Sequence, residues 1–447
     1  MKTALLLSAA ALLAAVAVAQ PPGAPRASVF PYPTHVTTLD NGLKVVIVPM
    51  PSEGLAALWS IVRTGSRDEV EPGRTGFAHF FEHMMFRGTE KFPARAYDEM
   101  LTKMGADANA FTTDDLTAYH MGIAAQDLET AMTLESDRFK NLSYQQQEFK
   151  TEAGAVYGEY RKNRASPFFT IFEAVHKEAF KQHTYGHTTM GYEADIKGMP
   201  ELFDYSRQFF GRYYRPENVV LLVTGDVDVD ATLALVKKHY GDWQPGYKAP
   251  EVKPEPPQNE ERKIQVSYEG QSLPILWLAY KGPAFAPADR AYMATYLLGD
   301  LAFGETSEVY KKLVLDEQVV ELLDAELSIN RDPGLLDIVT MVKDPAKVDY
   351  VLAEIDKAIA AYQAKPVEAQ RLNDLKSRVK YGFLMNLATP DAVAQSLARI
   401  IAVSGGPEAI DQMYAALGTV TPADVQNAAR ELLRADRRTV AVLRGES

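Results

Sequence analysis

FAHFFEHMMF, residues 77–86, places two histidines four positions apart, His79 and His83, with Glu82 directly before the second. Residues i and i+4 of an α-helix lie on one face, one turn apart, so both imidazoles can reach the same metal ion. Glu82 projects close to that face, where it can act as a base toward water. The neighbouring residues are apolar, which predicts a buried helix. From the pair alone, two core histidines satisfied by hydrogen bonds remain an alternative.

A third metal ligand has to come from elsewhere in the chain. A catalytic zinc site uses three protein ligands and keeps one position open. The chain has no cysteine, so this ligand must be a histidine or a carboxylate. Residues 148–161 predict a helix with Glu152 and Glu159 on one stripe, where one carboxylate can bind metal and the other can orient a ligand. A solvated acidic helix is the alternative.

These motifs together resemble the inverted-zincin peptidases of the pitrilysin/insulinase class, family M16, whose signature is HxxEH. Further similarity appears in TGSRDE at 64–69, in NAFT at 109–112, and in YYRPEN at 213–218, in the order found in the family. The similarity covers most of residues 35–245. It implies a half-size subunit similar to the processing-peptidase type, M16B.

The resemblance also implies roles for particular residues. One Zn²⁺ per chain would be bound by His79, His83 and Glu159. Glu82 would be the general base, and Glu152 would support a ligand. The segment Asn109, Ala110 and Phe111 would form an edge strand to which a substrate peptide adds as a further strand.

A second histidine pair, His183 and His187, also has a spacing of four. Gly186 and the loop-like sequence that follows weaken a helical arrangement there. The segment resembles a His-Pro-Tyr-Gly loop of the family that binds no metal, with Thr184 in place of proline. We therefore expect this pair to lie outside the metal site.

The first 19 residues predict a secretory signal peptide. A short Ala/Leu/Val run ends at Ala17-Val18-Ala19, a small-x-small cleavage site, and is too short for a comfortable membrane span. The mature protein is expected to be periplasmic or secreted. Its formal net charge of −12 argues against nucleic acid as a partner.

The remaining chain predicts two homologous α+β domains, each a mostly antiparallel sheet packed with helices. The first, a catalytic zinc-binding domain, covers residues 20–246, and a Pro/Glu-rich linker covers 247–262. The second covers 263–447, where the strand 275–282 echoes 57–64 and the strand 439–443 echoes 219–223. It has no HxxEH and is expected to be inactive.

One departure from the family affects the expected function. Active members carry an Arg and a Tyr, seven apart, in the second domain, and these touch the substrate near the metal. Val314 and Glu321 occupy these positions here, and no arginine lies between Arg290 and Arg331. Neither side chain can donate the expected hydrogen bond to an oxyanion. A homologous partner subunit is therefore expected to supply the pair, in a heterodimer, with a homodimer as the alternative.

The sequence thus predicts a zinc-dependent endopeptidase that cleaves peptides or unfolded segments in a clamshell chamber. The alternatives are a non-catalytic assembly subunit, or a peptide-binding subunit that retains the fold. Chelator-sensitive peptide hydrolysis separates the enzyme from both.

Overall fold

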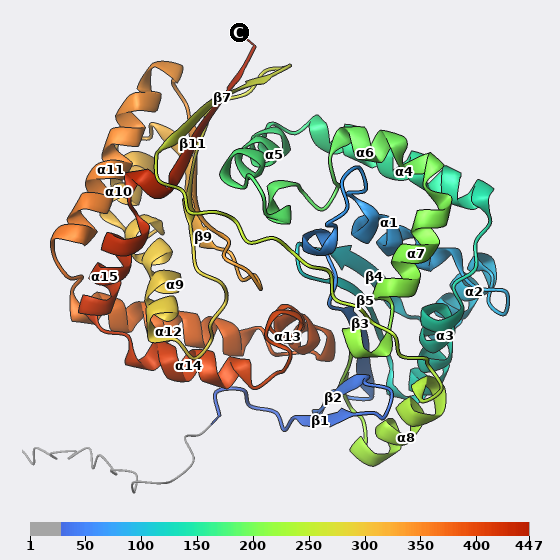
Figure 1. Ribbon diagram of the computed structural model, residues 1–447. Coiled ribbons are helices and arrows are strands. Elements are labelled where there is room, and N and C mark those ends of the chain that lie inside the picture. The colour runs from blue at the N-terminus through green and yellow to red at the C-terminus, as the bar shows by residue number, and fades with distance from the viewer. Residues whose placement is uncertain (1–27, 447) are drawn as a thin grey trace, which may run out of the picture.

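Two β-sheets of matching topology organise the chain in the computed structural model (Figure 1), which describes residues 28–446. The predicted signal peptide at 1–19 lies outside the described residues. The first sheet has the order β1-β2-β6-β3-β5-β4 and the second the order β7-β11-β8-β10-β9. The strands are β1 (His35–Thr38), β2 (Lys44–Pro49), β3 (Leu55–Val62), β4 (Asp107–Thr112), β5 (Thr117–Ala124), β6 (Val219–Gly225), β7 (Arg262–Tyr268), β8 (Ile275–Lys281), β9 (Val320–Leu327), β10 (Leu335–Val342) and β11 (Arg438–Gly445).

The two sheets confirm the predicted internal duplication. In the first sheet β2 and β6 are parallel and the other pairs are antiparallel. In the second sheet β7 and β11 form the one parallel pair. Strands β3 and β8, and likewise β6 and β11, therefore hold equivalent places, as the sequence echoes predicted. Only β1 lacks a counterpart among the described residues.

Helices fill the connections within each half. The first half contains α1 (Phe77–Met84), α2 (Ala94–Met104), α3 (Leu128–Asn141), α4 (Gln146–Arg164), α5 (Pro167–Ala179), α6 (Glu193–Gly198), α7 (Phe203–Tyr213) and α8 (Val229–Tyr240). The second contains α9 (Arg290–Phe303), α10 (Glu308–Tyr310), α11 (Val348–Ala364), α12 (Ala369–Met385), α13 (Pro390–Ser404), α14 (Ala409–Thr419) and α15 (Pro422–Leu432). None of the helices in residues 28–446 is both long and apolar enough to cross a membrane.

Strands β1 and β2 form a hairpin around Asn41-Gly42, with Thr38 opposite Lys44. Gly42 has a φ of +91°, and a Cβ there would lie 2.6 Å from Cγ of Glu217, so the turn requires glycine. Between α8 and β7 the chain forms no helix or strand, as expected of a linker. The domain boundaries themselves remain predictions.

Each half contributes one helix to the sheet of the other half. Helix α5 packs on β7, β8 and β11, and helix α13 packs on β3 and β6. Ile171 and Val175 of α5 join a core with Trp277 and Ala441. The sequence analysis did not predict α5, and it could not predict this exchange, which buries the inner face of each sheet under the other half.

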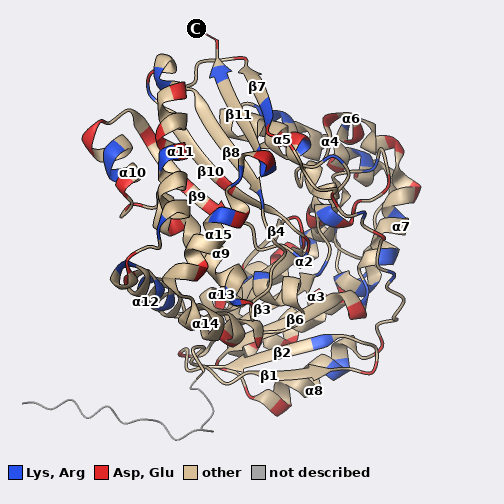
Figure 2. Cartoon of the chain, turned by 60° about the vertical axis from the view of Figure 1, so that its left-hand side comes forward, with Lys and Arg blue, Asp and Glu red and all other residues tan. Residues whose placement is uncertain are grey.

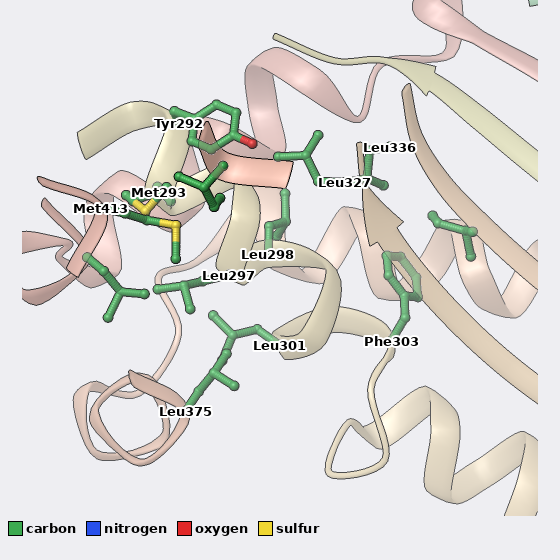
Figure 3. Close-up of a cluster of buried hydrophobic side chains, with 14 of the residues drawn as sticks. Tyr292, Met293, Leu297, Leu298, Leu301, Phe303, Leu327, Leu336, Leu375 and Met413 are labelled. Carbon is green, nitrogen blue, oxygen red and sulfur yellow. The ribbon is translucent and has the colours of Figure 1, made fainter. Parts of the chain in front are cut away.

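The remaining core of the second half surrounds α9, as Figure 3 shows. Apolar residues of α9 such as Met293, Leu297 and Leu301 are buried between the sheet and the helices α12 and α14. The charged residues, in contrast, are interspersed in sign along the helices (Figure 2). Such mixed charge is typical of solvated helix faces.

Candidate metal centre

Helix α1 carries the HxxEH motif and is buried, as predicted. Its side chains Phe77, Phe80, Phe81 and Met84 are fully enclosed in the core of the first half. Glu69 closes its amino end: one carboxylate oxygen accepts a hydrogen bond from the Gly76 N–H and the other from the Ala78 N–H, each at 2.7 Å. Because the apolar face of α1 packs into this core, the polar residues of the helix project toward α4 and β4.

His79, His83 and Glu159 meet in space. The carboxylate Oε2 of Glu159 lies 3.6 Å from Nε2 of His79 and 3.3 Å from Nε2 of His83. One ligand atom from each of the three residues lies within 4.8 Å of the others. Helix α4 therefore brings Glu159 to the two α1 histidines, the residue that the family resemblance implied.

This donor set suits zinc. Ligand atoms held at about 2.0–2.1 Å around one tetrahedral ion lie about 3.3 Å apart, close to the two distances found here. Burial and the nearby His83 lower the pKa of His79 to about 3, so its imidazole is neutral and can donate a lone pair. Two imidazoles and one carboxylate also leave a fourth position open, as catalytic zinc sites do.

Glu152 lies against His83 and outside the ligand group. Its Oε1 lies 2.9 Å from Nδ1 of His83, which leaves Nε2 directed toward Glu159. The other carboxylate oxygen accepts a 2.7 Å hydrogen bond from Nε of Arg87. The hydrogen bond between His83 and Glu152 raises the pKa of the His83 imidazole. Such an outer carboxylate fixes the tautomer and the ring orientation of a metal-binding histidine.

Glu82 lies beside the ligand group and is held by the sheet. Its Oε2 accepts a 2.7 Å hydrogen bond from Oγ1 of Thr112, the last residue of β4. Burial raises the pKa of Glu82, while the Thr112 hydrogen bond opposes this shift. A carboxylate with a raised pKa is better suited to carry a proton in both directions than an exposed one.

Strand β4 is an edge strand, as predicted, because it pairs only with β5. Alternate residues face opposite sides of the sheet. Ala110 packs against the core around α1. Phe111 packs against the core that includes residues of the second half, and its ring centroid lies 6.0 Å from that of Trp59. Asn109 is exposed. The free edge therefore runs beside the motif helix, although its use by a substrate stays a prediction.

The second histidine pair does not belong to the ligand group. His183 accepts a hydrogen bond from the Tyr185 N–H at Nδ1, and its Nε2 lies 2.9 Å from Asp332. His187 places Nδ1 2.9 Å from the Thr188 carbonyl. Both are buried structural histidines of the first half.

Val314 and Glu321 lie in the second half. Val314 belongs to a π-helical turn, Lys311–Asp316, and packs against the core. Glu321 is exposed on β9, the edge strand that corresponds to β4. Neither therefore offers a donor that could replace the expected Arg and Tyr.

Two residues that support the site were missed by the sequence analysis, Arg87 and Thr112. Arg87 follows the motif helix by three residues, and its role depends on the helix α4 packing against it. Thr112 is the last residue of the NAFT segment, so its place in that family motif is a sequence signal that could have identified it. Its contact with Glu82 nevertheless depends on how the sheet meets α1.

Comparisons with known proteins match both halves of the chain to one peptidase family. The model of "Insulinase (Peptidase family M16)" matches residues 44–193, and that of "Peptidase M16 inactive domain" matches residues 203–379. Zinc protease PqqE of Helicobacter pylori is 28% identical over 371 residues, covering 81% of this chain and 82% of PqqE. The beta subunit of the mitochondrial-processing peptidase of Bos taurus is 28% identical over 380 residues, covering 82% of this chain and 75% of the subunit.

A solved structure shares the whole fold. The crystal structure of a protease from Helicobacter pylori superposes with a TM-score of 0.87 at 25% identity, covering 92% of this chain and 99% of that one. The two family models together cover strands of both sheets, from β2 to β10, and most of the helices between them. From its motif, its fold and these matches, the chain belongs to peptidase family M16, the insulinase family.

Proposed function

We propose that this chain is a zinc-dependent endopeptidase that hydrolyses peptides or unfolded protein segments. The convergence of His79, His83 and Glu159, with Glu82 held beside them by Thr112, is the observation that carries the proposal. Relatives in family M16 include zinc proteases. The same donor set argues for one Zn²⁺ per chain.

The side chains of the site have different roles in hydrolysis. Bound at His79, His83 and Glu159, zinc would act as a Lewis acid and lower the pKa of water toward neutrality. Glu82 takes the proton from the attacking water and later gives it to the leaving amine. Glu152 holds the ring of His83 in the ligating orientation throughout.

The substrate would bind as an added strand along Asn109, Ala110 and Phe111. The free edge of β4 offers unpaired backbone groups, which an extended peptide can satisfy. Because β4 ends at Thr112, the same strand would align the peptide with Glu82. Only an extended chain can pair in this way, which favours peptides and unfolded segments within a closed chamber.

A homologous M16 subunit would complete the site. Val314 and Glu321 cannot donate hydrogen bonds to an oxyanion, so the expected Arg and Tyr would come from a partner chain. The mitochondrial-processing peptidase relative is itself named as a subunit, which is compatible with a heterodimer. A homodimer is the alternative. The predicted signal peptide would direct this assembly to the periplasm or outside the cell.

A non-catalytic role is the second candidate. The lack of the Arg/Tyr pair, and a match to an "inactive domain" model over 203–379, are compatible with an assembly or peptide-binding subunit. The meeting of His79, His83 and Glu159, with Glu82 held beside them, favours the enzyme instead, because this set offers both a metal site and a base. Peptide turnover separates the two candidates.

The test uses a mixed library of internally quenched peptides and the purified mature chain, alone and with a homologous subunit that carries the Arg/Tyr pair. Chelator-sensitive cleavage in either arrangement supports the enzyme. Cleavage by the chain alone would show that no separate partner is needed. The absence of cleavage in both arrangements, from a chain that retains one zinc, would overturn the proposal in favour of the non-catalytic role.

A further inference from the structure

Two Arg-Asp pairs from opposite halves of the chain bind each other reciprocally. Arg67 and Asp68 lie in a 3₁₀ turn, Ser66–Asp68, within the connection between β3 and α1, and Arg331 and Asp332 lie in the turn between β9 and β10. Arg67 Nη2 lies 2.6 Å from Asp332 Oδ2, and Arg331 Nη2 lies 2.9 Å from Asp68 Oδ2. Each arginine therefore binds the aspartate that follows the other arginine. We name these four residues the Arg-Asp clasp.

Arg331 extends the clasp to a third carboxylate. Its Nε donates a 2.9 Å hydrogen bond to Oδ1 of Asp115, and its backbone N–H donates a 3.2 Å bond to Oδ2 of the same residue. Asp115 lies in the turn that joins β4 to β5. Asp68 and Asp115 are 0% and 2% exposed, and Arg331 compensates these two buried carboxylates together with Arg67, whose Nη1 lies 3.1 Å from Asp68 Oδ1 and whose Nε lies 3.8 Å from Asp115 Oδ1.

The two carboxylates belong to the two segments that lead into the candidate metal centre. Asp68 directly precedes Glu69, whose carboxylate caps the amino end of α1. Asp115 lies three residues after Thr112, which bonds Glu82. Arg331 thus holds, with one planar guanidinium group, the approach to the motif helix and the end of the edge strand.

The two segments also touch each other closely. The Arg67 N–H donates a 2.8 Å hydrogen bond to the Asp114 carbonyl, and a Cβ at Gly65 would lie 2.2 Å from the Thr113 carbonyl oxygen. Such close approach transmits a shift of one segment to the other, since neither backbone has room to yield. A change at Arg331 would therefore move both segments together.

We propose that Arg331 is a positioning residue through which the second half of the chain sets the geometry of the metal centre in the first half. The proposal rests on the proposed peptidase function for its kinetic consequence. Arginine suits this role because its fork can bind two carboxylates in fixed directions, which the ammonium group of lysine cannot do. The inactive second half would thereby contribute to catalysis without touching the substrate.

The test compares Arg331→Met, Arg331→Lys and the control Arg399→Met in the full chain. Arg399 lies on α13 and donates hydrogen bonds to the same β9–β10 turn, to the Ile329 carbonyl and to Asn330 Oδ1, each at 3.2 Å. The Arg399→Met variant therefore disturbs the β9–β10 turn while Asp68 and Asp115 keep their contacts with Arg331. Bound zinc, kcat and KM are measured for each variant, well below its melting temperature.

The expected result is a fall in kcat of about 10- to 100-fold for Arg331→Met, because small misplacements of a catalytic group have costs of this size. With zinc in excess, zinc content should stay at the wild-type level, since the substitution shifts the ligands on α1 without removing any of them. Arg331→Lys should melt near the wild type yet keep the lowered kcat. Arg399→Met should keep the wild-type kcat. Equal kcat values for Arg331→Met and Arg399→Met would overturn the proposal.

Amide hydrogen exchange supplies a readout that needs no activity. Arg331→Met, or Arg331→Lys if the first variant fails to fold, should exchange faster over residues 77–84 and 107–112, whereas Arg399→Met should not. Unchanged exchange in both segments would overturn the proposal. If the wild type proves inactive with and without a partner, the peptidase function fails, and this comparison still decides whether Arg331 positions the two segments.

Discussion

Thr112 Oγ1 donates a 2.7 Å hydrogen bond to Glu82 Oε2, which joins the last residue of the edge strand β4 to the motif helix α1. This bond links the surface proposed for substrate binding to the residue proposed as general base. It also restricts Glu82 to one orientation beside the ligand group. The relationship makes Thr112 the first supporting residue to test.

Replacing Thr112 with valine should lower kcat by about tenfold or more, because a poorly oriented general base loses part of its 10²–10⁴-fold contribution. Valine keeps the shape of the side chain and removes only the hydroxyl. Thr112→Ser keeps the hydroxyl and should retain most of the activity. Zinc content, measured by atomic absorption, should not change in either variant. A kcat at the wild-type level in Thr112→Val would show that the hydrogen bond does not orient Glu82.

Replacing Glu152 with glutamine should weaken zinc binding by about 10- to 100-fold, which is the usual cost of losing an outer carboxylate. Glutamine keeps the size of the side chain but loses the negative charge that strengthens the hydrogen bonds with His83 and Arg87. Glu148→Gln, in the exposed first turn of the same helix, is the matched control. Competition with a chromogenic chelator measures both affinities. Equal affinities would place Glu152 outside the metal centre.

Leu397→Ala in α13 should reduce the free energy of unfolding by about 2–5 kcal/mol, the range for truncating a fully buried leucine. Because α13 covers β3 and β6 of the first half, the loss should appear in the stability of both halves. Gln395→Ala, on the exposed side of α13, is the control. Urea unfolding followed by circular dichroism and by tryptophan fluorescence should shift together in Leu397→Ala. Separate transitions would contradict the interlocked packing of the two halves.

Asp337 provides a prediction about pH. Burial raises its pKa to about 6, although His176 and a 2.7 Å hydrogen bond from the Trp277 indole lower it, and Glu326 opposes them. The folded protein therefore binds a proton that the unfolded chain releases near pH 4. This contribution to stability is present at low pH and is lost as the pH rises through about 6.

Asp337→Asn removes this titration while keeping an acceptor for Trp277. The difference in unfolding free energy, wild type minus Asp337→Asn, should fall between about pH 4 and about pH 7, by roughly 1.4 kcal/mol for each unit of pKa shift. Denaturant titrations across this range measure the difference. A constant difference would show that the pKa of Asp337 is not raised.

The sequence predicted the parts of the site that depend on local periodicity. The i, i+4 spacing placed His79 and His83 on one helix face, and the seven-residue spacing placed Glu152 and Glu159 on one stripe. The structure brings His79, His83 and Glu159 together and places Glu152 against His83. The repeated strands likewise predicted the duplicated sheets, because a strand buried on both faces has a recognisable apolar run.

Contacts between distant segments could not be predicted in the same way. Thr112 bonds Glu82, and Arg331 bonds Asp68, only because sheets and helices pack in a particular arrangement. No local pattern distinguishes Arg331 from a solvated arginine in a turn. The exchange of α5 and α13 between the halves is also invisible to periodicity, since an amphipathic helix does not specify which sheet it covers.

The most direct test of the central claim is to compare the wild type with Glu82→Gln for peptide turnover and bound zinc, in whichever assembly cleaves the quenched library. Glutamine keeps the size and the Thr112 contact but cannot accept the proton from water. The account predicts that turnover falls by at least about 10²-fold while one zinc per chain remains bound. Full activity in Glu82→Gln, with zinc in place, would contradict it.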